Sequence, residues 1–326
     1  MIKSTVPKNK NLIFKKSHLV LVLLVLFFMN TLYHQNRLFS TMPGEGGART
    51  MPGEGGARAS GVMEKLSSDY TFYSSLEALY HKYGAEIAAY RPKMRVWCEK
   101  TKSCKFSDYE AEMLYMLIRE NKPQKVFEMA PNMGFSSHWI LHALHLNDNT
   151  SVLHSFDIHS KSVKFMDPDF ESRWVFTLGD YAKLFDDGKL DMESYDFLFI
   201  DSLHEEMFAR GYCKRLFSTR KQKAIVAVHD IVADEFGGGR ESAEVYKYLA
   251  LANNAANVFT LSQYAMPNSL YERKSNEIIP KLNKLRAGLG IVKDCDKLMS
   301  CDQANHDPLY FKTGNPDPTI FFTLNY

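Results

Sequence analysis

The chain places carboxylates after two apolar runs, where they could bind a metal ion together. The run at 197–200 is followed by Asp201, and the run at 224–228 is followed by His229 and Asp230. If the two runs are neighbouring parallel strands, their carboxyl ends meet at one edge of a sheet. Carboxylate oxygens suit Mg²⁺ and related hard divalent cations. The pattern therefore predicts a metal site with Asp201 and Asp230 as ligands. His229 is a third ligand through nitrogen, a group that supports the ligands, or a histidine that only faces neighbouring structure.

A short loop follows an earlier apolar run at 125–130, and its residues indicate which kind of cofactor the chain could bind. The loop reads PNMGFSS at 131–137 and leads into a helical segment. A dinucleotide-binding loop needs three glycines so that the backbone can approach a pyrophosphate, and this loop has only Gly134. The carboxylate of Glu128 would also repel a pyrophosphate. The loop argues against a nicotinamide oxidoreductase and favours a bound group without phosphates.

Short apolar strands that alternate with helical segments position these residues, which is typical of a doubly wound α/β fold with a mostly parallel sheet. We expect seven strands in this sheet. The first six are predicted at 125–130, 151–158, 174–179, 195–201, 224–230 and 257–263. Helices are predicted near 135–146, 205–218 and 240–254. Two more strand candidates, 287–292 and 318–326, follow a long Lys-rich insertion, and one of them returns antiparallel.

The segment before the sheet is predicted to be a helical N-terminal extension at 61–122. Helical sequence runs from 69 to 121 and is expected to break at Arg91–Pro92, because proline removes a helix hydrogen bond. A second helix opens at Ser107, and Glu110 three residues later completes a capping box. Residues 123–326 are expected to form the domain that contains the sheet, with a C-terminal extension.

The loop resembles the first motif of class I S-adenosylmethionine (SAM)-dependent methyltransferases, which runs acidic-x-Gly-x-x-Gly-x-Ser. The resemblance covers roughly 126–265, and Ala130 and Asn132 stand where glycine is commoner. It implies that Asp157, 29 residues after Glu128, accepts the ribose hydroxyls, unless Asp157 caps a helix. It also implies that Asp180 and Tyr181 contact the adenine, unless Asp180 is a turn residue. The cofactor-binding residues that it implies are Glu128, Ala130, Asn132, Gly134, Ser136, Asp157, Asp180, Tyr181 and Asp201.

The later strand ends are similar to those of metal-dependent O-methyltransferases, especially macrolide-sugar methyltransferases with an Asp-x-x-His element. In that element the Asp binds the metal and the His is the general base, which assigns these roles to Asp201 and His204. The alternative for His204 is a residue that begins a helix. His229 departs from the pattern, because relatives often carry a second acid there. Methyl transfer needs a hydroxyl aligned with the sulfonium methyl group and deprotonated as it attacks, which a metal and a base provide.

The N-terminal region predicts a membrane anchor. Five lysines within residues 1–17 precede an apolar helix at 18–34 that is short for a bilayer. Because no small-x-small site follows, we expect a signal anchor that is not cleaved. The lysines predict a cytoplasmic N-terminus and a single-pass type II protein of the Golgi or endoplasmic reticulum. A Gly/Pro-rich stalk with a tandem nonapeptide follows at 35–60.

Cysteine spacing and a sequon agree with the secretory pathway. Disulfides are expected within the pairs Cys98/Cys104 and Cys295/Cys301, and the alternative is that all the cysteines are reduced. Asn149 begins a glycosylation sequon.

The composition of this 326-residue chain limits the classes of molecule that it is expected to bind. Forty Lys and Arg against 38 Asp and Glu leave a net charge of +2, which argues against nucleic-acid binding. We expect a small-molecule or glycan hydroxyl as acceptor, with SAM and Mg²⁺ or Mn²⁺ as cofactors. The sequence does not determine the oligomeric state. A type II glycosyltransferase that uses an Asp-x-Asp triplet, at 167–169 or 294–296, is one alternative, and an inactive binding module is another.

Overall fold

The computed structural model describes most of the chain after residue 71. The described ranges are 72–101, 107–147, 150–232, 241–252, 258–262, 265, 269–291 and 319–324. The predicted tail, anchor and stalk lie outside them, as do Asn149, Cys104 and the second cysteine pair. In the described part of the chain, no helix combines the length and apolar character needed to cross a membrane.

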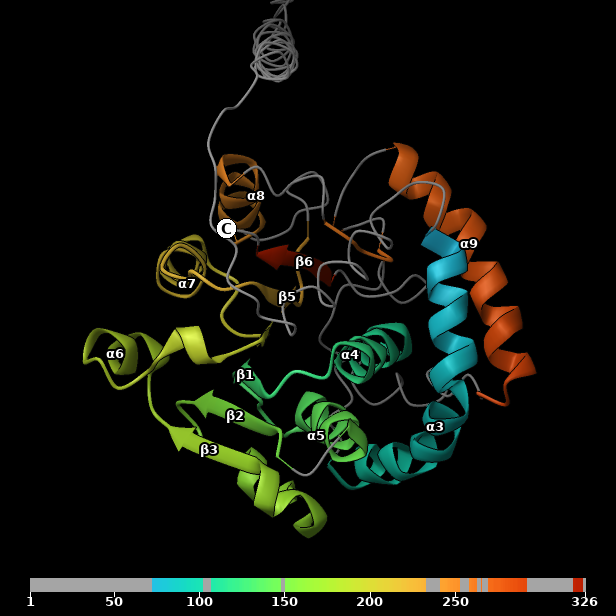
Figure 1. The fold of residues 1–326 in the computed structure, drawn as a ribbon, viewed down its shortest axis with the longest axis horizontal. Coiled ribbons are helices and arrows are strands. Elements are labelled where there is room, and N and C mark those ends of the chain that lie inside the picture. The colour runs from blue at the N-terminus through green and yellow to red at the C-terminus, as the bar shows by residue number, and fades with distance from the viewer. Residues whose placement is uncertain are drawn as a thin grey trace, which may run out of the picture. The chain divides into compact units, whose positions relative to one another are not determined.

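The described strands form one sheet in the order β3-β2-β1-β4-β5-β6 (Figure 1). The first five strands are parallel and β6 is antiparallel to β5. The strands are β1 (Lys125–Met129), β2 (Val152–Asp157), β3 (Trp174–Leu178), β4 (Phe197–Ile200), β5 (Ala224–Val228) and β6 (Ile320–Leu324). The strand order reverses between β1 and β4, the point at which open α/β sheets bind ligands. This confirms the predicted doubly wound α/β fold.

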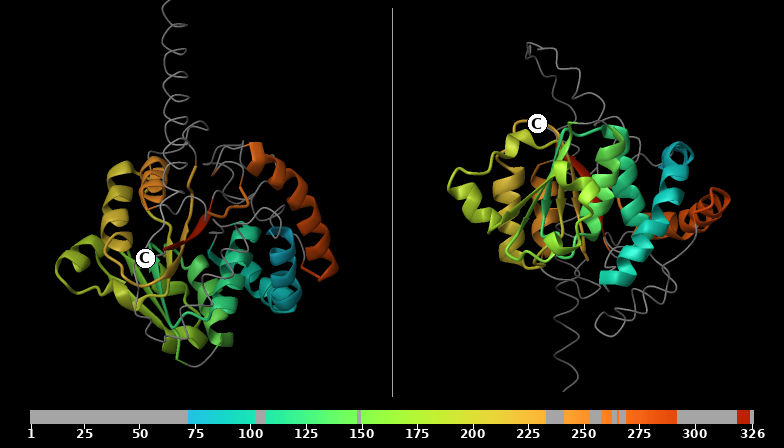
Figure 2. Two further views of the ribbon diagram at one scale, coloured as in Figure 1. Left: turned by 45° about the horizontal axis from the view of Figure 1, so that its top comes forward. Right: turned by 90° about the horizontal axis from the view of Figure 1, so that it is seen from below.

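Helices cover both faces of the sheet, which explains why the central strands are continuous apolar runs (Figure 2). One face carries α3 (Phe72–Thr101), α4 (Asp108–Asn121) and α5 (Phe135–Asn147), with α9 (Ser269–Gly288) packed beside α3. The other face carries α6 (Tyr181–Asp186), α7 (Glu206–Tyr212), which continues as a π-helical turn at Cys213–Phe217, and α8 (Glu241–Leu251). Short 3-10 helices lie at Ser162–Phe165, Pro168–Arg173 and Met192–Ser194.

Three expectations about the elements are wrong within the described residues. The sheet has six strands instead of seven, because the segment predicted at 257–263 contributes only one bridge, between Phe259 and Phe321. The segment predicted as a strand at 287–292 is the end of α9 and a turn, closed by the bond from the Ile291 amide to the Arg286 carbonyl. The preceding Lys-rich insertion contains α9 itself. Finally, α3 runs through Pro92 without a break.

The predicted start of the next helix is confirmed. Ser107 caps α4, and its hydroxyl and the Glu110 carboxylate form the reciprocal bonds of a capping box. This cap fixes the position of Glu110 at the beginning of the helix.

A buried ion network joins α3, α4 and α9 and explains why the helix continues past Arg91. The Glu112 carboxylate on α4 accepts hydrogen bonds from Arg91 (2.5 Å), from Arg286 (2.7 Å to each oxygen) and from the Tyr80 hydroxyl (2.7 Å). Asp108 pairs with both arginines. Because Arg91 is held on the buried face of α3, the hydrogen bond lost at the following proline does not end the helix.

We predict that Glu112→Gln lowers the free energy of unfolding by about 3–5 kcal/mol, because it leaves the charges of Arg91 and Arg286 under-compensated in the interior. Urea denaturation of the full chain, followed by circular dichroism, measures this change. The matched control is Glu77→Gln, which removes an exposed partner of His81 on α3 and is expected to change stability by less than about 0.5 kcal/mol. Equal urea midpoints for the Glu112 variant and the wild type would contradict the role of the network.

Candidate active site

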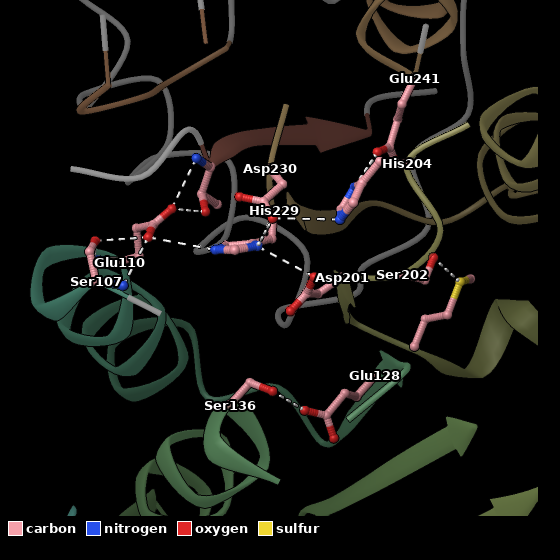
Figure 3. Close-up of polar contacts among 12 residues, drawn as sticks. Ser107, Glu110, Glu128, Ser136, Asp201, Ser202, His204, His229, Asp230 and Glu241 are labelled. Carbon is pink, nitrogen blue, oxygen red and sulfur yellow. Dashed lines mark hydrogen bonds and ion pairs between the residues drawn. The ribbon is translucent and has the colours of Figure 1, made fainter. Parts of the chain in front are cut away.

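The structure brings the predicted metal ligands together at the carboxyl edge of the sheet (Figure 3). One potential ligand atom from each of Asp201, His229 and Asp230 lies within 4.8 Å of the others. Backbone bonds hold these residues in place, because the Asp201 amide donates to the Met129 carbonyl of β1 and the His229 amide to the Ile200 carbonyl of β4. The parallel pairing of the strands therefore extends into the site and sets the separation of its side chains.

His229 is buried between three carboxylates. Its Nδ1 lies 3.4 Å from an oxygen of Asp201 and 3.4 Å from an oxygen of Asp230, and its Nε2 lies 3.7 Å from an oxygen of Glu110. Burial favours the neutral ring, but the negative charges of Asp230, Asp201 and Glu110 outweigh it and raise the pKa of His229 well above its usual value. The ring therefore directs one nitrogen toward the aspartates and the other toward helix α4.

Glu110 connects the site to the N-terminal helices. Besides facing His229, its carboxylate accepts hydrogen bonds from the Thr319 amide (3.0 Å) and the Thr319 hydroxyl. Thr319 immediately precedes β6, so one side chain ties the start of α4 to the last strand and to the buried histidine. From the sequence, Glu110 was expected only to complete the capping box.

His204 lies on the other side of Asp230. Its Nδ1 is 2.6 Å from an oxygen of Glu241, and its Nε2 is 3.5 Å from an oxygen of Asp230. Burial favours the neutral form of His204, but the hydrogen bond and charge of Glu241, together with Asp230 and Asp201, raise its pKa above the usual value. The imidazole is 38% exposed, so a base at this position can meet an acceptor.

Left-handed backbone concentrates at the same edge of the sheet. Among the described residues, four non-glycine residues have positive φ, and Ala130 (58°), Asn132 (49°) and Asp230 (56°) are three of them. Ala130 and Asn132 are the two loop positions at which the family motif commonly has glycine. The loop therefore keeps the backbone shape of a glycine-rich turn without the glycines. Such strained residues gather at functional sites more often than elsewhere.

Asp157 holds this loop against the end of β2. One carboxylate oxygen accepts the Asn132 amide (3.2 Å) and the other accepts the His159 amide (2.9 Å). Asp157 therefore does not cap an α-helix, and it lies beside the loop with which it is predicted to bind the cofactor.

Glu128 and Ser136 are interior residues. The Glu128 carboxylate is fully buried and accepts hydrogen bonds from the hydroxyls of Ser136 (2.7 Å), Ser137 (2.7 Å) and Ser155 (2.5 Å). Burial raises the pKa of Glu128, although these three hydrogen bonds act in the opposite direction. The arrangement joins β1, β2 and the start of α5, and it gives both residues a positioning role beneath the loop. Ser137 and Ser155 were not predicted, although each is a polar residue in an apolar segment.

Asp180 and Tyr181 lie apart from the metal cluster, at the end of β3. The Asp180 carboxylate caps α6 by accepting the Ala182 amide (2.8 Å). The Tyr181 ring is buried, with its centroid 5.5 Å from that of Phe208. Their predicted contact with an adenine stays a prediction.

Glu241 is the main functional candidate that the sequence analysis missed. It opens α8, is 2% exposed and faces His204 across 37 residues of sequence. An acidic residue in the first turn of a helix is common, so its type and position did not distinguish it from a solvent-exposed helix start.

Comparison with known families identifies one domain in this chain. A family model described as a methyltransferase domain matches residues 131–231, from the loop after β1 to just beyond β5. No curated protein matches the chain in sequence.

Solved structures with similarity to the chain include O-methyltransferases. The O-methyltransferase from Bacillus cereus in complex with SAH, the demethylated form of SAM, is 13% identical with a TM-score of 0.40, covering 52% of this chain and 78% of that chain. The O-methyltransferase TomG from Streptomyces achromogenes, in complex with SAM, is 14% identical with a TM-score of 0.40, covering 54% and 80%. A methyltransferase from Geobacter sulfurreducens is 17% identical with a TM-score of 0.37, covering 49% and 76%.

These structural likenesses are distant, so the identification depends on the family match and on the strand ends. The matched range begins directly after β1 and Ala130, and it holds left-handed Asn132 and the acidic ends of β2 and β4. Residues 131–231 therefore form a class I SAM-dependent methyltransferase domain, which confirms the family predicted from the sequence.

Proposed function

We propose that this protein transfers a methyl group from SAM to a hydroxyl of a sugar or glycan, with the assistance of a divalent cation. One observation carries the proposal: Asp201, His229 and Asp230 cluster at the strand ends directly beside His204. A cation-binding group next to an imidazole is suited to an oxygen acceptor, which must be oriented and must lose a proton.

The cofactor is expected over the loop after β1. The left-handed Ala130 and Asn132 shape this loop around Gly134, and Asp157 lies at its side with a carboxylate that can accept ribose hydroxyls. Glu128 and Ser136 hold the loop from below, since their polar atoms are already bonded to each other and to neighbouring serines. Bound SAM would supply the electrophilic methyl group.

The donor set fits a hard divalent cation. Two carboxylates and one imidazole offer ligand atoms within 4.8 Å of one another, and the two aspartates are partly exposed. Oxygen donors of this kind suit Mg²⁺ or Mn²⁺, with His229 as the nitrogen donor. A cation held there would orient the acceptor hydroxyl and lower its pKa.

His204 is the proposed general base. Its Nε2 faces the side of Asp230, so a hydroxyl placed beside the aspartates would find this nitrogen within reach. Bound SAM would supply the methyl group, and the electron pair of its C–S bond would remain on sulfur as the hydroxyl oxygen forms the new C–O bond. The hydroxyl proton passes to His204 and then to solvent.

The expected cellular compartment of the protein supports a sugar or glycan as the acceptor. A type II anchor would place the catalytic domain in the lumen of the Golgi or endoplasmic reticulum, where glycan hydroxyls are abundant. Cys98 is disulfide-bonded, and disulfides persist in oxidising compartments of this kind. Cys213, by contrast, is a free and buried thiol.

The glycosyltransferase alternative has less support. In the triplet at 167–169, the Asp167 carboxylate accepts the Asp169 amide (3.1 Å) and caps a 3-10 helix, away from the acidic strand ends. The triplet at 294–296 lies outside the described residues.

We predict that the full chain binds SAH and that Asp157→Asn weakens this binding about 10- to 100-fold, because a carboxylate accepts ribose hydroxyls more strongly than an amide does. Isothermal titration calorimetry measures both affinities. Asp191→Asn is the matched control, because Asp191 caps a 3-10 helix before β4, at the opposite edge of the sheet. A folded wild-type chain that releases no heat with SAH would overturn the proposed cofactor.

The metal site predicts that Mn²⁺ binds without cofactor and that Asp201→Asn and Asp230→Asn each weaken it by about tenfold or more. Electron paramagnetic resonance of free Mn²⁺ during a titration gives the dissociation constants. Asp187→Asn is the control, since Asp187 is a surface residue paired with Lys183. If both site variants bind Mn²⁺ as tightly as the control, the metal assignment is wrong.

A further inference from the structure

His204 is held by an acidic residue that comes from a helix distant in sequence. One oxygen of the Glu241 carboxylate lies 2.6 Å from His204 Nδ1 (Figure 3). The other oxygen accepts a hydrogen bond from the Tyr212 hydroxyl at 2.8 Å. Tyr212 belongs to α7, Glu241 to α8 and His204 to the loop after β4. A continuous series of polar contacts therefore runs from Tyr212 through Glu241 and His204 to Asp230.

We propose that Glu241 is a positioning residue that fixes the ring orientation and the tautomer of His204. An ionised carboxylate only accepts hydrogen bonds, and the 2.6 Å contact of Nδ1 with Glu241 is much shorter than the 3.5 Å contact of Nε2 with Asp230, so we expect the proton of a neutral His204 ring on Nδ1. The lone pair is then on Nε2, the nitrogen that faces Asp230. Without Glu241 the ring could carry its proton on either nitrogen, and only one tautomer has its basic atom toward the acceptor. This inference rests on the proposed function, in which His204 is the base.

The surroundings of Glu241 favour this role over that of an ordinary helix start. A carboxylate in the first turn of a helix is stabilised near solvent by the helix dipole, yet Glu241 is 2% exposed. Burial of a charged group is costly unless hydrogen bonds compensate for it, and here both oxygens are bonded. Glu244, one turn later, shows the ordinary arrangement, because it pairs with the guanidinium of Arg210 at the surface.

The contact of Glu241 with His204 is similar to that in a catalytic triad, in which a buried carboxylate orients a histidine base. Tyr212 in turn holds Glu241 in place, because its hydroxyl donates a hydrogen bond to the Glu241 oxygen that does not contact the histidine. The Tyr212 side chain, at the end of α7, is itself fully buried, and its ring packs against those of Phe208 and Phe217, with centroids 6.1 Å and 5.5 Å away.

The first test reads the tautomer directly and needs no acceptor. The full chain is labelled with ¹⁵N-histidine, and two-bond nitrogen–proton NMR spectra are recorded at a pH where the ring is neutral, with His204→Gln to assign the signal. We expect His204 to carry its proton on Nδ1 in the wild type and to become a mixture of tautomers in Glu241→Ala. Glu241→Gln, whose amide oxygen can still accept, should retain the Nδ1–H tautomer. Glu244→Gln should leave the signal unchanged.

The second test separates the rate from binding. Transfer from methyl-labelled SAM is measured over a panel of sugar acceptors. We expect Glu241→Ala to lower kcat roughly 10- to 100-fold while the KM for SAM changes less than about twofold, with partial recovery in Glu241→Gln. Glu244→Gln keeps the wild-type kcat.

Different results would overturn the role of Glu241 and the proposed function. A wild-type His204 protonated on Nε2, or a wild-type kcat in Glu241→Ala while His204→Gln is inactive, overturns the role of Glu241. A full chain that methylates no hydroxyl in the panel, or a fully active His204→Gln, counts against the proposed function instead. If Glu241→Ala does not fold, Glu241→Gln and Tyr212→Phe test the role of Glu241 through kcat, which each is expected to lower, and a wild-type kcat in both would overturn that role.

Discussion

The parallel pairing of β4 with β1 and β5 is the constraint on which the site depends. Ile200 lies beside both Met129 and Val228 in the register, so the next residues of β4 and β5 must leave the sheet side by side. Those residues are Asp201 and His229, followed by Asp230 with a left-handed backbone. A shift of either strand by one residue would turn its acidic side chain away, because side chains alternate between the faces. The apolar strands thus determine the geometry of the most polar part of the molecule.

Two buried glutamates contact the histidines at this edge from helices on opposite faces of the sheet. Glu110 reaches His229 from α4, and Glu241 reaches His204 from α8. Both histidines direct their other nitrogen toward Asp230. The position of α4 depends in turn on the network of Glu112 with Arg91 and Arg286. The N-terminal helices are therefore connected to the candidate active site through hydrogen bonds as well as through packing.

The sequence predicted most of this arrangement because its strands are short, apolar and followed by acidic residues. The same local reasoning failed for α9 and at Pro92, where contacts with distant residues decide the outcome. Arg286 and Arg91 are 195 positions apart, and only the folded chain shows that they share Glu112. Glu128 and Ser136 were predicted as cofactor ligands from their motif positions. The motif does not reveal that they bond to each other beneath the loop.

We propose that one edge of the sheet holds both SAM and a divalent cation. A crystal structure of the full chain with SAH and Mn²⁺, with anomalous data for manganese, tests it most directly. We expect SAH over the loop at 130–134 beside Asp157, and an anomalous peak bonded to Asp201, His229 and Asp230. A peak elsewhere, or SAH bound away from this loop, would contradict it.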